Sequence, residues 1–195
     1  DGIEQVMSWL KENADDADPL AMSNCLQFLS NMSLDPKFAK TIAESGAVDL
    51  VLDILSGENQ SSATMASGIN LLQHICKAMP EQCAAQVKSG IANRLLQMFI
   101  GSTGGRRGSA HQYSNDPQAA IAMMAYMAQL ATNDEIKSQL KDMGAADVLM
   151  TLMKLHSNSP ELMNIGKNTL STMLSPKELL ELSLIHISEP TRQKP

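Results

Sequence analysis

The side chains that most often perform catalysis are few in this chain, and they do not form a recognisable constellation. The histidines, His74, His111, His156 and His186, are scattered, and there is no HExxH or GxSxG motif. His74 and Cys76 are two residues apart on an expected helix, so their side chains point to different faces, which argues against a metal site. We therefore expect no catalytic residues, no metal ligands and no cofactor.

A glycine- and serine-rich segment, 101–115, carries the remaining candidates for local chemistry. Its sequence, GSTGGRRGSAHQYSN, predicts a flexible loop. A Walker-type phosphate loop is excluded because no Lys-Ser/Thr pair follows it and no strand precedes it. Arg106 and Arg107 precede Ser109 in a run that resembles a substrate site for basophilic kinases. A phosphate on Ser109 would place about −2 charge beside two arginines, so Ser109 is a candidate phosphorylation site.

The composition favours packed helices. The chain has 195 residues, 44% of them hydrophobic but only 3% aromatic, and Leu, Ala, Ile and 14 Met dominate over the aromatic residues that sheets favour. The formal net charge is −6 and no basic run is long enough to follow a phosphate backbone, so nucleic acid is not an expected partner. The longest apolar run, 119–128, is shorter than the roughly 20 residues of a membrane span.

The cysteines bear on the cellular compartment of the protein, and the first residues bear on where its native N-terminus lies. Cys25, Cys76 and Cys83 form no CxxC pair and lie among apolar residues, which predicts buried, reduced thiols. Such thiols are typical of a cytoplasmic protein, with a nuclear, cytoskeletal or ciliary site as the alternative. The sequence opens at Asp1 inside a helical pattern, so we expect the native N-terminus to lie further upstream.

A pattern repeats along the chain with a period near 44 residues. Gly2, Gly46, Gly90 and Gly144 each precede a short amphipathic segment, and the glycines are 44, 44 and 54 residues apart. Glycine suits a tight turn between two helices because it adopts positive φ without steric cost. The longer third spacing places the extra residues in the segment 101–115. Another helix start precedes three of the glycines by ten residues, at Pro36, Pro80 and Asp134.

A longer helix follows each glycine-led helix. Three of the four begin with a capping residue and a proline, Asp18-Pro19, Asp116-Pro117 and Ser159-Pro160, and the other begins at Ser61-Ser62. Each has an apolar stripe at helical spacing. The repeating unit is therefore a short helix, a turn, a middle helix, a loop and a long helix. One such unit cannot bury its apolar faces alone, so the units are expected to stack around a shared core.

This pattern resembles the armadillo repeat family, above all in the segment from Ile42, IAESGAVDLVLDIL, and the resemblance extends over about residues 1–181. It implies an all-α, right-handed α-solenoid of three-helix repeats. The expected domains are a partial repeat with its second and third helices (1–33), three repeats (34–78, 79–132 with the flexible insertion 101–115, and 133–174), the start of a truncated repeat (175–181), and the tail 182–195.

The resemblance also implies where a ligand would bind. Armadillo proteins hold extended peptides or partner helices in a groove lined by the third helices, and the nuclear-import adaptors carry a Trp-x-x-x-Asn ladder there. The matching face here is rich in amides and has no tryptophan, because Trp9 lies on a middle helix. A classical basic nuclear-localisation peptide is therefore not the expected ligand. The candidate binding residues are Gln27, Asn31, Asn70, His74, Lys77, Gln129, Asn168 and Thr172.

Amide side chains both donate and accept hydrogen bonds, so these residues could hold the backbone of a protein or peptide ligand. The alternative is that they are ordinary solvated side chains. The expected function is that of a protein–protein interaction scaffold without enzymatic activity. A regulatory armadillo segment of a larger enzyme, and a client-binding module of a motor-protein chaperone, are the other interpretations.

The C-terminal residues depart from the repeat. His186 stands where the next glycine is expected, and residues 182–192 read LSLIHISEPTR. This run resembles the translation of a transposase-derived sequencing-library adapter, so the tail 182–195 is expected to be non-native and the native protein to continue with further repeats.

Overall fold

The structure is a computed structural model that describes residues 2–14, 18–57, 60–100 and 110–187. Within these ranges the chain forms thirteen α-helices and no strand, so the predicted all-α class is confirmed. None of the described helices combines the length and the apolar character needed to cross a membrane.

Three kinds of helix alternate along the chain. The long helices are α2 (Pro19–Met32), α5 (Ser62–Ala78), α9 (Pro117–Leu130) and α12 (Pro160–Met173). The middle helices are α1 (Gly2–Asn13), α4 (Ala47–Ser56), α7 (Ile91–Ile100) and α11 (Ala145–Leu155). The short helices are α3 (Pro36–Glu44), α6 (Pro80–Lys88) and α10 (Asp134–Asp142), and two further helices are α8 (Ala110–Asn115) and α13 (Pro176–Ile187).

The long helices begin where the sequence predicts, because each has a side chain that caps its first turn. The carboxylates of Asp18 and Asp116 accept hydrogen bonds from backbone N–H groups of α2 and α9. The hydroxyl oxygens of Ser61 and Ser159 do the same for α5 and α12. A side-chain cap satisfies backbone donors that would otherwise have no partner at the helix start.

Glycine makes the turn between each short helix and the middle helix that follows. Gly46, Gly90 and Gly144 have φ of 85°, 81° and 77°, in the left-handed region where a side chain is strained. Gly2 occupies the same place in the sequence pattern and is the first residue of α1; it follows Asp1, which lies outside the described residues.

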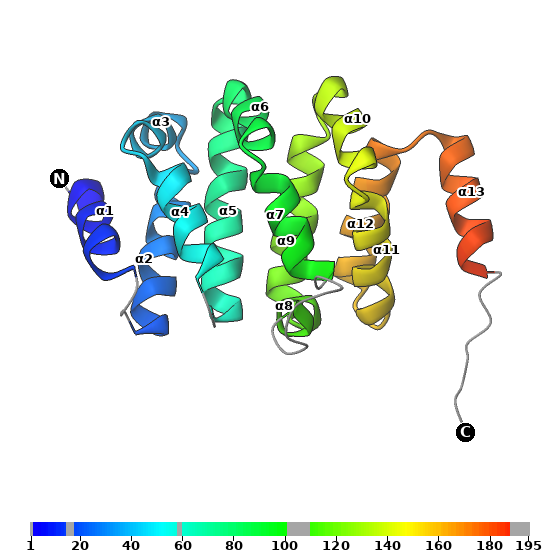
Figure 1. The fold of residues 1–195 in the computed structure, drawn as a ribbon, viewed down its shortest axis with the longest axis horizontal. Helices are drawn as coiled ribbons and strands as arrows, with labels where there is room; N and C mark the ends of the chain where they lie inside the picture. Colours follow the sequence, from blue (N-terminus) through cyan, green and yellow to red (C-terminus); the bar gives the residue numbers. More distant parts are fainter. Residues whose placement is uncertain (1, 15–17, 58–59, 101–109, 188–195) are drawn as a thin grey trace.

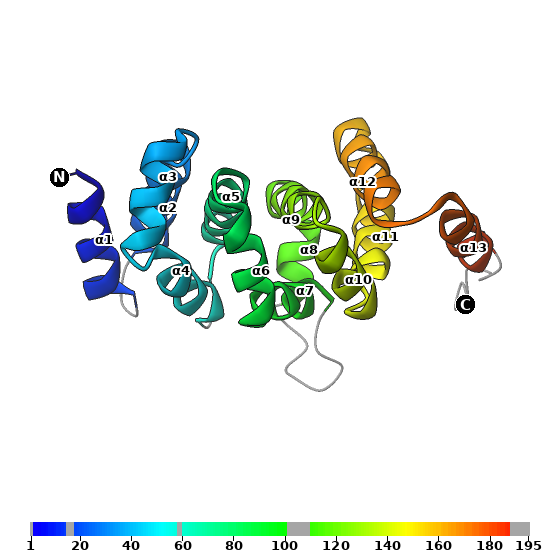
Figure 2. The same cartoon turned by 90° about the horizontal axis from the view of Figure 1, so that it is seen from above.

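The helices follow one another along the longest axis of the molecule in the order of the sequence (Figure 1). The long helices form one layer, in which α2 packs on α5, α5 on α9, and α9 on α12. Seen from above, these four helices trace a shallow arc, and α4, α7 and α11 lie on the other side of the molecule (Figure 2). The outward side of the long-helix layer is therefore a continuous surface built from successive units.

One hydrophobic cluster extends through the molecule from Ile3 on α1 to Met173 on α12. Methionines contribute to it throughout, and Met65, Met123, Met124 and Met127 have no exposed surface. Each long helix contributes to this core together with helices of its own unit and of the neighbouring units. Helices that are distant in sequence therefore share one hydrophobic core.

The sequence predicts a flexible loop over residues 101–115, but the last part of this segment is helical. Residues 110–115 form α8, and Tyr113 and Ser114 are buried there. The Tyr113 hydroxyl donates to the Gln60 carbonyl oxygen at 3.0 Å, and Nε2 of His156 lies 2.7 Å from the Ser114 carbonyl oxygen. These contacts come from residues distant in sequence, which explains why local composition did not reveal the helix. Ser109, with Arg106 and Arg107, lies outside the described residues.

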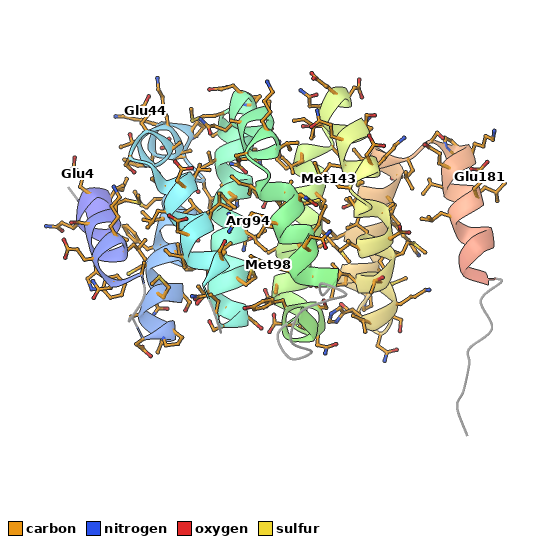
Figure 3. The ribbon with its side chains drawn as sticks, viewed as in Figure 1. Glu4, Glu44, Arg94, Met98, Met143 and Glu181 are labelled. Carbon is orange, nitrogen blue, oxygen red and sulfur yellow. The ribbon has the colours of Figure 1, made fainter. Side chains whose placement is uncertain are left out.

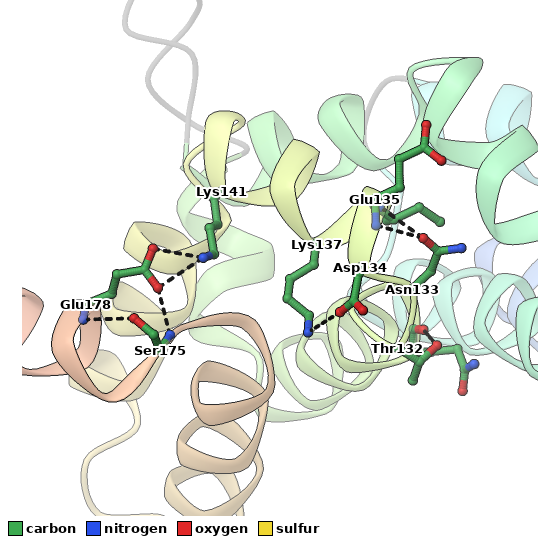
Figure 4. A network of polar contacts seen from close by, with 10 residues as sticks. Thr132, Asn133, Asp134, Glu135, Lys137, Lys141, Ser175 and Glu178 are labelled. Atoms are coloured by element: carbon green, nitrogen blue, oxygen red, sulfur yellow. Dashed lines mark hydrogen bonds and ion pairs between the residues drawn. The ribbon is translucent and has the colours of Figure 1, made fainter.

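At the far end, α13 packs Leu179 and Leu182 against the core and is also held by polar contacts. Nζ of Lys141 on α10 lies 2.8 and 3.0 Å from the carboxylate oxygens of Glu178, and the backbone N–H of Ser175 donates to that carboxylate (Figure 4). These contacts lower the pKa of Glu178 to about 2, with the Lys141 hydrogen bond as the largest cause. The helix continues to Ile187, beyond the predicted limit at residue 181, and residues 188–195 lie outside the described part of the chain.

Candidate functional site

Seven of the eight candidate binding residues lie at two corresponding positions of the long helices, and Lys77 lies one turn after His74 on α5. On α2, Gln27 and Asn31 are one turn apart, and the spacing of four residues recurs in Asn70 with His74 on α5 and Asn168 with Thr172 on α12. Five of the eight are exposed and three are half-buried. The exposed ones are Gln27, Asn31, Lys77, Asn168 and Thr172; the half-buried ones are Asn70, His74 and Gln129.

At the boundary between α2 and α5, some of the expected binding groups are already in use. Nε2 of Gln27 donates to Oδ1 of Asn31 at 2.9 Å, and the hydroxyl of Ser67 donates to Oε1 of Gln27 at 3.3 Å. Both polar atoms of the Gln27 amide are therefore in use: Nε2 bonds within α2, and Oε1 links α2 to α5. A ligand would meet the Asn31 amide nitrogen, which has no hydrogen-bond partner among the described residues, more readily than the Gln27 amide.

His74 is a second link between the same two helices. Its Nδ1 lies 2.9 Å from the carbonyl oxygen of Ser30 and 3.2 Å from the Ser30 hydroxyl. In the tautomer with a proton on Nδ1, the ring donates to that carbonyl oxygen. Because the ring is half-buried and bonded to α2, its main role in this structure is to fix the register of α5 on α2.

On α12 the two candidate residues also differ. The Thr172 hydroxyl donates at 2.9 Å to the Asn168 carbonyl oxygen in its own helix, so its proton is not offered outward. The Asn168 side-chain amide makes no hydrogen bond within the described residues, and the same holds for the side-chain amides of Asn70 and Gln129. These amides, the Asn31 amide nitrogen and the Lys77 ammonium are the groups that the face presents to a ligand.

The centre of this face is less polar than its two ends. Ala125 on α9 stands at the place that amides occupy on the other long helices, and it lies on one side of its helix with the half-buried Ile121 and Ala128. The series of amides is therefore interrupted at α9. Among the eight candidate residues Lys77 carries the only charge, so the recognition chemistry of the face is that of neutral hydrogen-bonding groups.

The opposite side of the molecule is built differently. Arg94 and Met98, one turn apart on α7, lie in the middle of that side (Figure 3). Nη2 of Arg94 donates to the Ser56 hydroxyl at the end of α4 at 2.6 Å, which joins two successive units. The polar contacts on this side therefore connect neighbouring units, and no row of amides like that of the long helices follows α4, α7 and α11.

A buried polar cluster between α5, α6 and α9 was not predicted from the sequence. The Tyr126 hydroxyl donates to Oε1 of Gln86 at 2.7 Å, while Nε2 of Gln86 has no partner among the described residues. Sγ of Cys83 lies 3.6 Å from the Cys76 carbonyl oxygen. Burial raises the pKa of Tyr126 well above its ordinary value, and the hydrogen bond with Cys83 together with burial raises the pKa of Cys76.

All three cysteines are free thiols, but they are not equally buried. Cys76 and Cys83 have relative exposures of 0% and 3%, as predicted. Cys25 is only half-buried, so its predicted full burial is wrong. In the described part of the chain, no three or more His, Cys, Asp or Glu side chains are grouped so that they could hold a metal ion.

Comparison with known proteins adds one finding about the fold. No family model matches the chain, and no curated protein matches it either. Among solved structures, the chain is similar to the crystal structure of an engineered protein from the Northeast Structural Genomics Consortium, with a TM-score of 0.70 and 17% sequence identity. The similarity covers 95% of this chain and 68% of that one. At this identity the similarity concerns the helical fold alone.

Proposed function

We propose that this chain is an armadillo-type α-solenoid whose long-helix face binds an extended segment of another protein and catalyses no reaction. The observation that carries the proposal is the layer of α2, α5, α9 and α12, which presents polar groups without a hydrogen-bond partner among the described residues: the amide nitrogen of Asn31 and the side-chain amides of Asn70, Gln129 and Asn168. The order of short, middle and long helices and the glycine turns at Gly46, Gly90 and Gly144 support the armadillo interpretation.

The spacing of the long helices suits an extended ligand. Packed helices are about 8–10 Å apart, and an extended chain rises about 3.3 Å per residue, so neighbouring long helices would meet backbone groups about three residues apart. Amides such as Asn70 and Asn168 offer a donor and an acceptor to such a backbone. Main-chain pairing of this kind fixes the path of the ligand and leaves sequence preference to the apolar surface around Ala125.

The proposed ligand is a protein or peptide rather than nucleic acid. The face has one cation, Lys77, among its candidate residues, and the chain has a formal net charge of −6, which opposes phosphate binding. The proposed ligand is also not a classical basic nuclear-localisation signal. The three free cysteines support a cytoplasmic setting within this proposal, with nuclear, cytoskeletal or ciliary sites as alternatives.

The proposal is tested with peptides selected on the protein itself. Random linear peptides displayed on phage are selected against the whole chain, and the affinity of the best peptide is measured by fluorescence anisotropy. The triple variant Asn31→Ala, Asn70→Ala, Asn168→Ala is expected to bind at least about tenfold more weakly, because it removes the side-chain amides of Asn70 and Asn168 and the open amide nitrogen of Asn31. Asn93→Ala on α7 is the matched control, since Asn93 is an exposed asparagine outside the long helices.

Two outcomes would contradict the proposal. Equal affinity of the triple variant and the unchanged protein would place the binding site elsewhere. Equal weakening by Asn93→Ala would show that the effect of the triple variant is not specific to the long-helix face. Circular dichroism of both variants checks that the helices remain folded.

A further inference from the structure

The corner between α5 and α6 brings two cysteines together. Cys76 lies in the last turn of α5, and Cys83 lies on α6, which packs back against α5 (Figure 1). Sγ of Cys83 lies 3.6 Å from the Cys76 carbonyl oxygen, and the two side chains are also hydrogen-bonded to each other. Both are free thiols, so the corner holds a reduced pair of neighbouring sulfur atoms.

A proline explains why the Cys83 side chain lies against this carbonyl group. In a continuing helix, the Cys76 carbonyl oxygen would accept a hydrogen bond from the backbone N–H four residues later. That residue is Pro80, which has no N–H and begins α6. The Cys83 thiol supplies the donor that the proline lacks. The two cysteines are therefore brought together by the way the chain turns at this corner.

The two sulfur atoms differ in their readiness to ionise. The hydrogen bond with Cys76 lowers the pKa of Cys83, and a backbone hydrogen bond acts in the same direction, against burial and the carboxylate of Glu81. The same contact between the two thiols raises the pKa of Cys76, as burial does. Because the thiolate is the nucleophile, Cys83 is the sulfur that reacts first, and Cys76 stays protonated beside it.

A buried donor without an acceptor belongs to the same cluster. Gln86 follows Cys83 by three residues, so the two side chains share one side of α6. Gln86 is 1% exposed, its Oε1 accepts from the Tyr126 hydroxyl, and its Nε2 has no partner among the described residues. Leaving a buried amide N–H without an acceptor costs free energy. An oxygen atom added to the Cys83 sulfur would offer such an acceptor on the same side of the helix.

We propose that Cys76 and Cys83 form an oxidation-sensitive dithiol, which hydrogen peroxide converts to an intramolecular disulfide. The Cys83 thiolate attacks one peroxide oxygen, so that an S–O bond forms, the O–O bond breaks, and the leaving hydroxide takes up a proton to become water. The Cys76 sulfur then attacks the Cys83 sulfenic acid, so that the S–S bond forms and the hydroxyl group leaves as water with the Cys76 proton. Together the two sulfur atoms lose two electrons, and one peroxide is reduced to two molecules of water.

The helix α6 provides the route for the oxidant. Cys76 and Cys83 are 0% and 3% exposed, so peroxide reaches them when the corner opens. This helix has nine residues, and its start at Met79 has no side-chain cap, unlike the starts of the long helices. A short helix without a cap opens locally more readily than a long one. Closing of the corner then returns the two sulfur atoms to each other.

Cys25 is an internal comparison for this proposal. It is half-buried and therefore more accessible than the pair. Burial raises its pKa, however, and this opposes formation of its thiolate. If exposure governed oxidation, Cys25 would react first, whereas the pairing of thiols favours Cys83. The proposal goes beyond peptide binding and does not depend on it.

The first test uses the unchanged chain. The protein is reduced, freed of reductant, treated with hydrogen peroxide, alkylated and digested with trypsin. Because trypsin cleaves after Lys77 and Lys88, the two cysteines fall in the separate peptides 41–77 and 78–88. Mass spectrometry is expected to find these two peptides joined by a disulfide that reduction breaks, with Cys25 still alkylated. Oxidation of Cys25 while the pair stays reduced would overturn the proposal, and so would a disulfide that includes Cys25.

The second test identifies the sulfur that reacts first. Cys76→Ser removes the thiol that closes the disulfide but keeps a hydroxyl donor beside Cys83, so Cys83 is expected to accumulate as sulfenic acid and to be labelled by dimedone. In the matched variant Cys83→Ser, labelling of Cys76 is expected to be at least about tenfold lower, because its thiolate is disfavoured. Equal labelling of the two cysteines would contradict the assigned order.

A further variant controls for general effects of losing a thiol. Cys25→Ser is expected to form the disulfide at an unchanged rate, since Cys25 takes no part in the pair. Slower formation in Cys25→Ser would overturn the assignment of the pair. Circular dichroism and melting temperatures of the three variants are compared first, and the test on the unchanged chain decides the proposal even where a variant does not fold.

Discussion

The middle of the molecule and its N-terminal end use the same sequence pattern with different results. Tyr126 on α9 and Phe28 on α2 hold the same position in their units, yet Tyr126 has no exposed surface and Phe28 is 41% exposed. The helix itself does not make this difference, because both helices begin with Asp-Pro and both have apolar stripes. It arises from the preceding long helix: α5 packs on α9, whereas no long helix precedes α2 among the described residues. In this fold a residue's environment is set by the neighbouring unit.

The largest expected effect comes from truncating the two aromatic counterparts. Tyr126→Ala should cost about 3–5 kcal/mol of unfolding free energy, because it leaves a cavity between α5, α6 and α9. Phe28→Ala should cost about 1 kcal/mol, since its ring is already partly in water. Urea unfolding followed by circular dichroism measures both. Equal costs would show that α2 is packed as tightly as α9, against the structure.

The buried cluster of the middle region allows a sharper comparison. Tyr126→Phe removes the donor to Gln86 and should cost about 1–3 kcal/mol, because Gln86 would then be buried without a partner. Adding Gln86→Leu to Tyr126→Phe should recover much of that loss, since both polar groups are then gone. The same unfolding experiment serves as the measurement. A double variant no more stable than Tyr126→Phe would show that Gln86 has another role.

Replacing a glycine with alanine should have a smaller effect on stability, and the sign of that effect should differ between Gly46 and Gly2. Gly46→Ala should cost about 1 kcal/mol, because Gly46 has φ of 85° and no atom lies close enough to clash with a Cβ. Gly2→Ala should be neutral or slightly stabilising, since Gly2 begins α1 and alanine is the better helix former. Melting temperatures of the two variants distinguish these signs. A destabilising Gly2→Ala would mean that Gly2 does form a turn.

The smallest expected effect is at the C-terminal end, where stability depends on pH through the carboxyl group of Glu178. The folded-state pKa of Glu178 is lowered from 4.5 to about 2, so its stabilising contacts are present above about pH 4.5 and are lost as the pH falls toward 2. Lys141→Met should raise the pKa of Glu178 toward its ordinary value, because it removes the main hydrogen-bond donor. Carboxyl NMR titration of both proteins measures this change. An unchanged pKa would show that Lys141 does not hold α13.

Much of the fold could be predicted from the sequence because its signals are local. The capping residues and prolines marked the starts of the long helices, and Gly46, Gly90 and Gly144 marked turns whose positive φ the structure confirms. The helix α8 escaped prediction, because the order of Tyr113 depends on a hydrogen bond to Gln60, which is far away in sequence. The relative placement of successive units likewise depends on contacts such as that between Thr64 and Pro19.

The candidate site remains a prediction, and the structure adds the state of its side chains. Spacing predicts that the candidate residues share one side of the long helices, and five of the eight are exposed. Sequence could not show that Gln27 is bonded to Ser67, or that His74 is bonded to Ser30, because these contacts cross between α2 and α5. The sequence contains Ala125 where the other long helices have an amide, and Phe28 among the apolar residues of α2. They acquire meaning only when the neighbouring helices are in place.

The central claim is that α5, α9 and α12 each bury apolar side chains against the preceding long helix, so that the middle of the layer is the most stable part of the molecule. Native-state hydrogen exchange followed by mass spectrometry tests this most directly. The account predicts that amides of α5 and α9 exchange last, those of α2 and α12 earlier, and those of α13 first. Uniform exchange along the chain, or slowest exchange in α1 or α13, would contradict it.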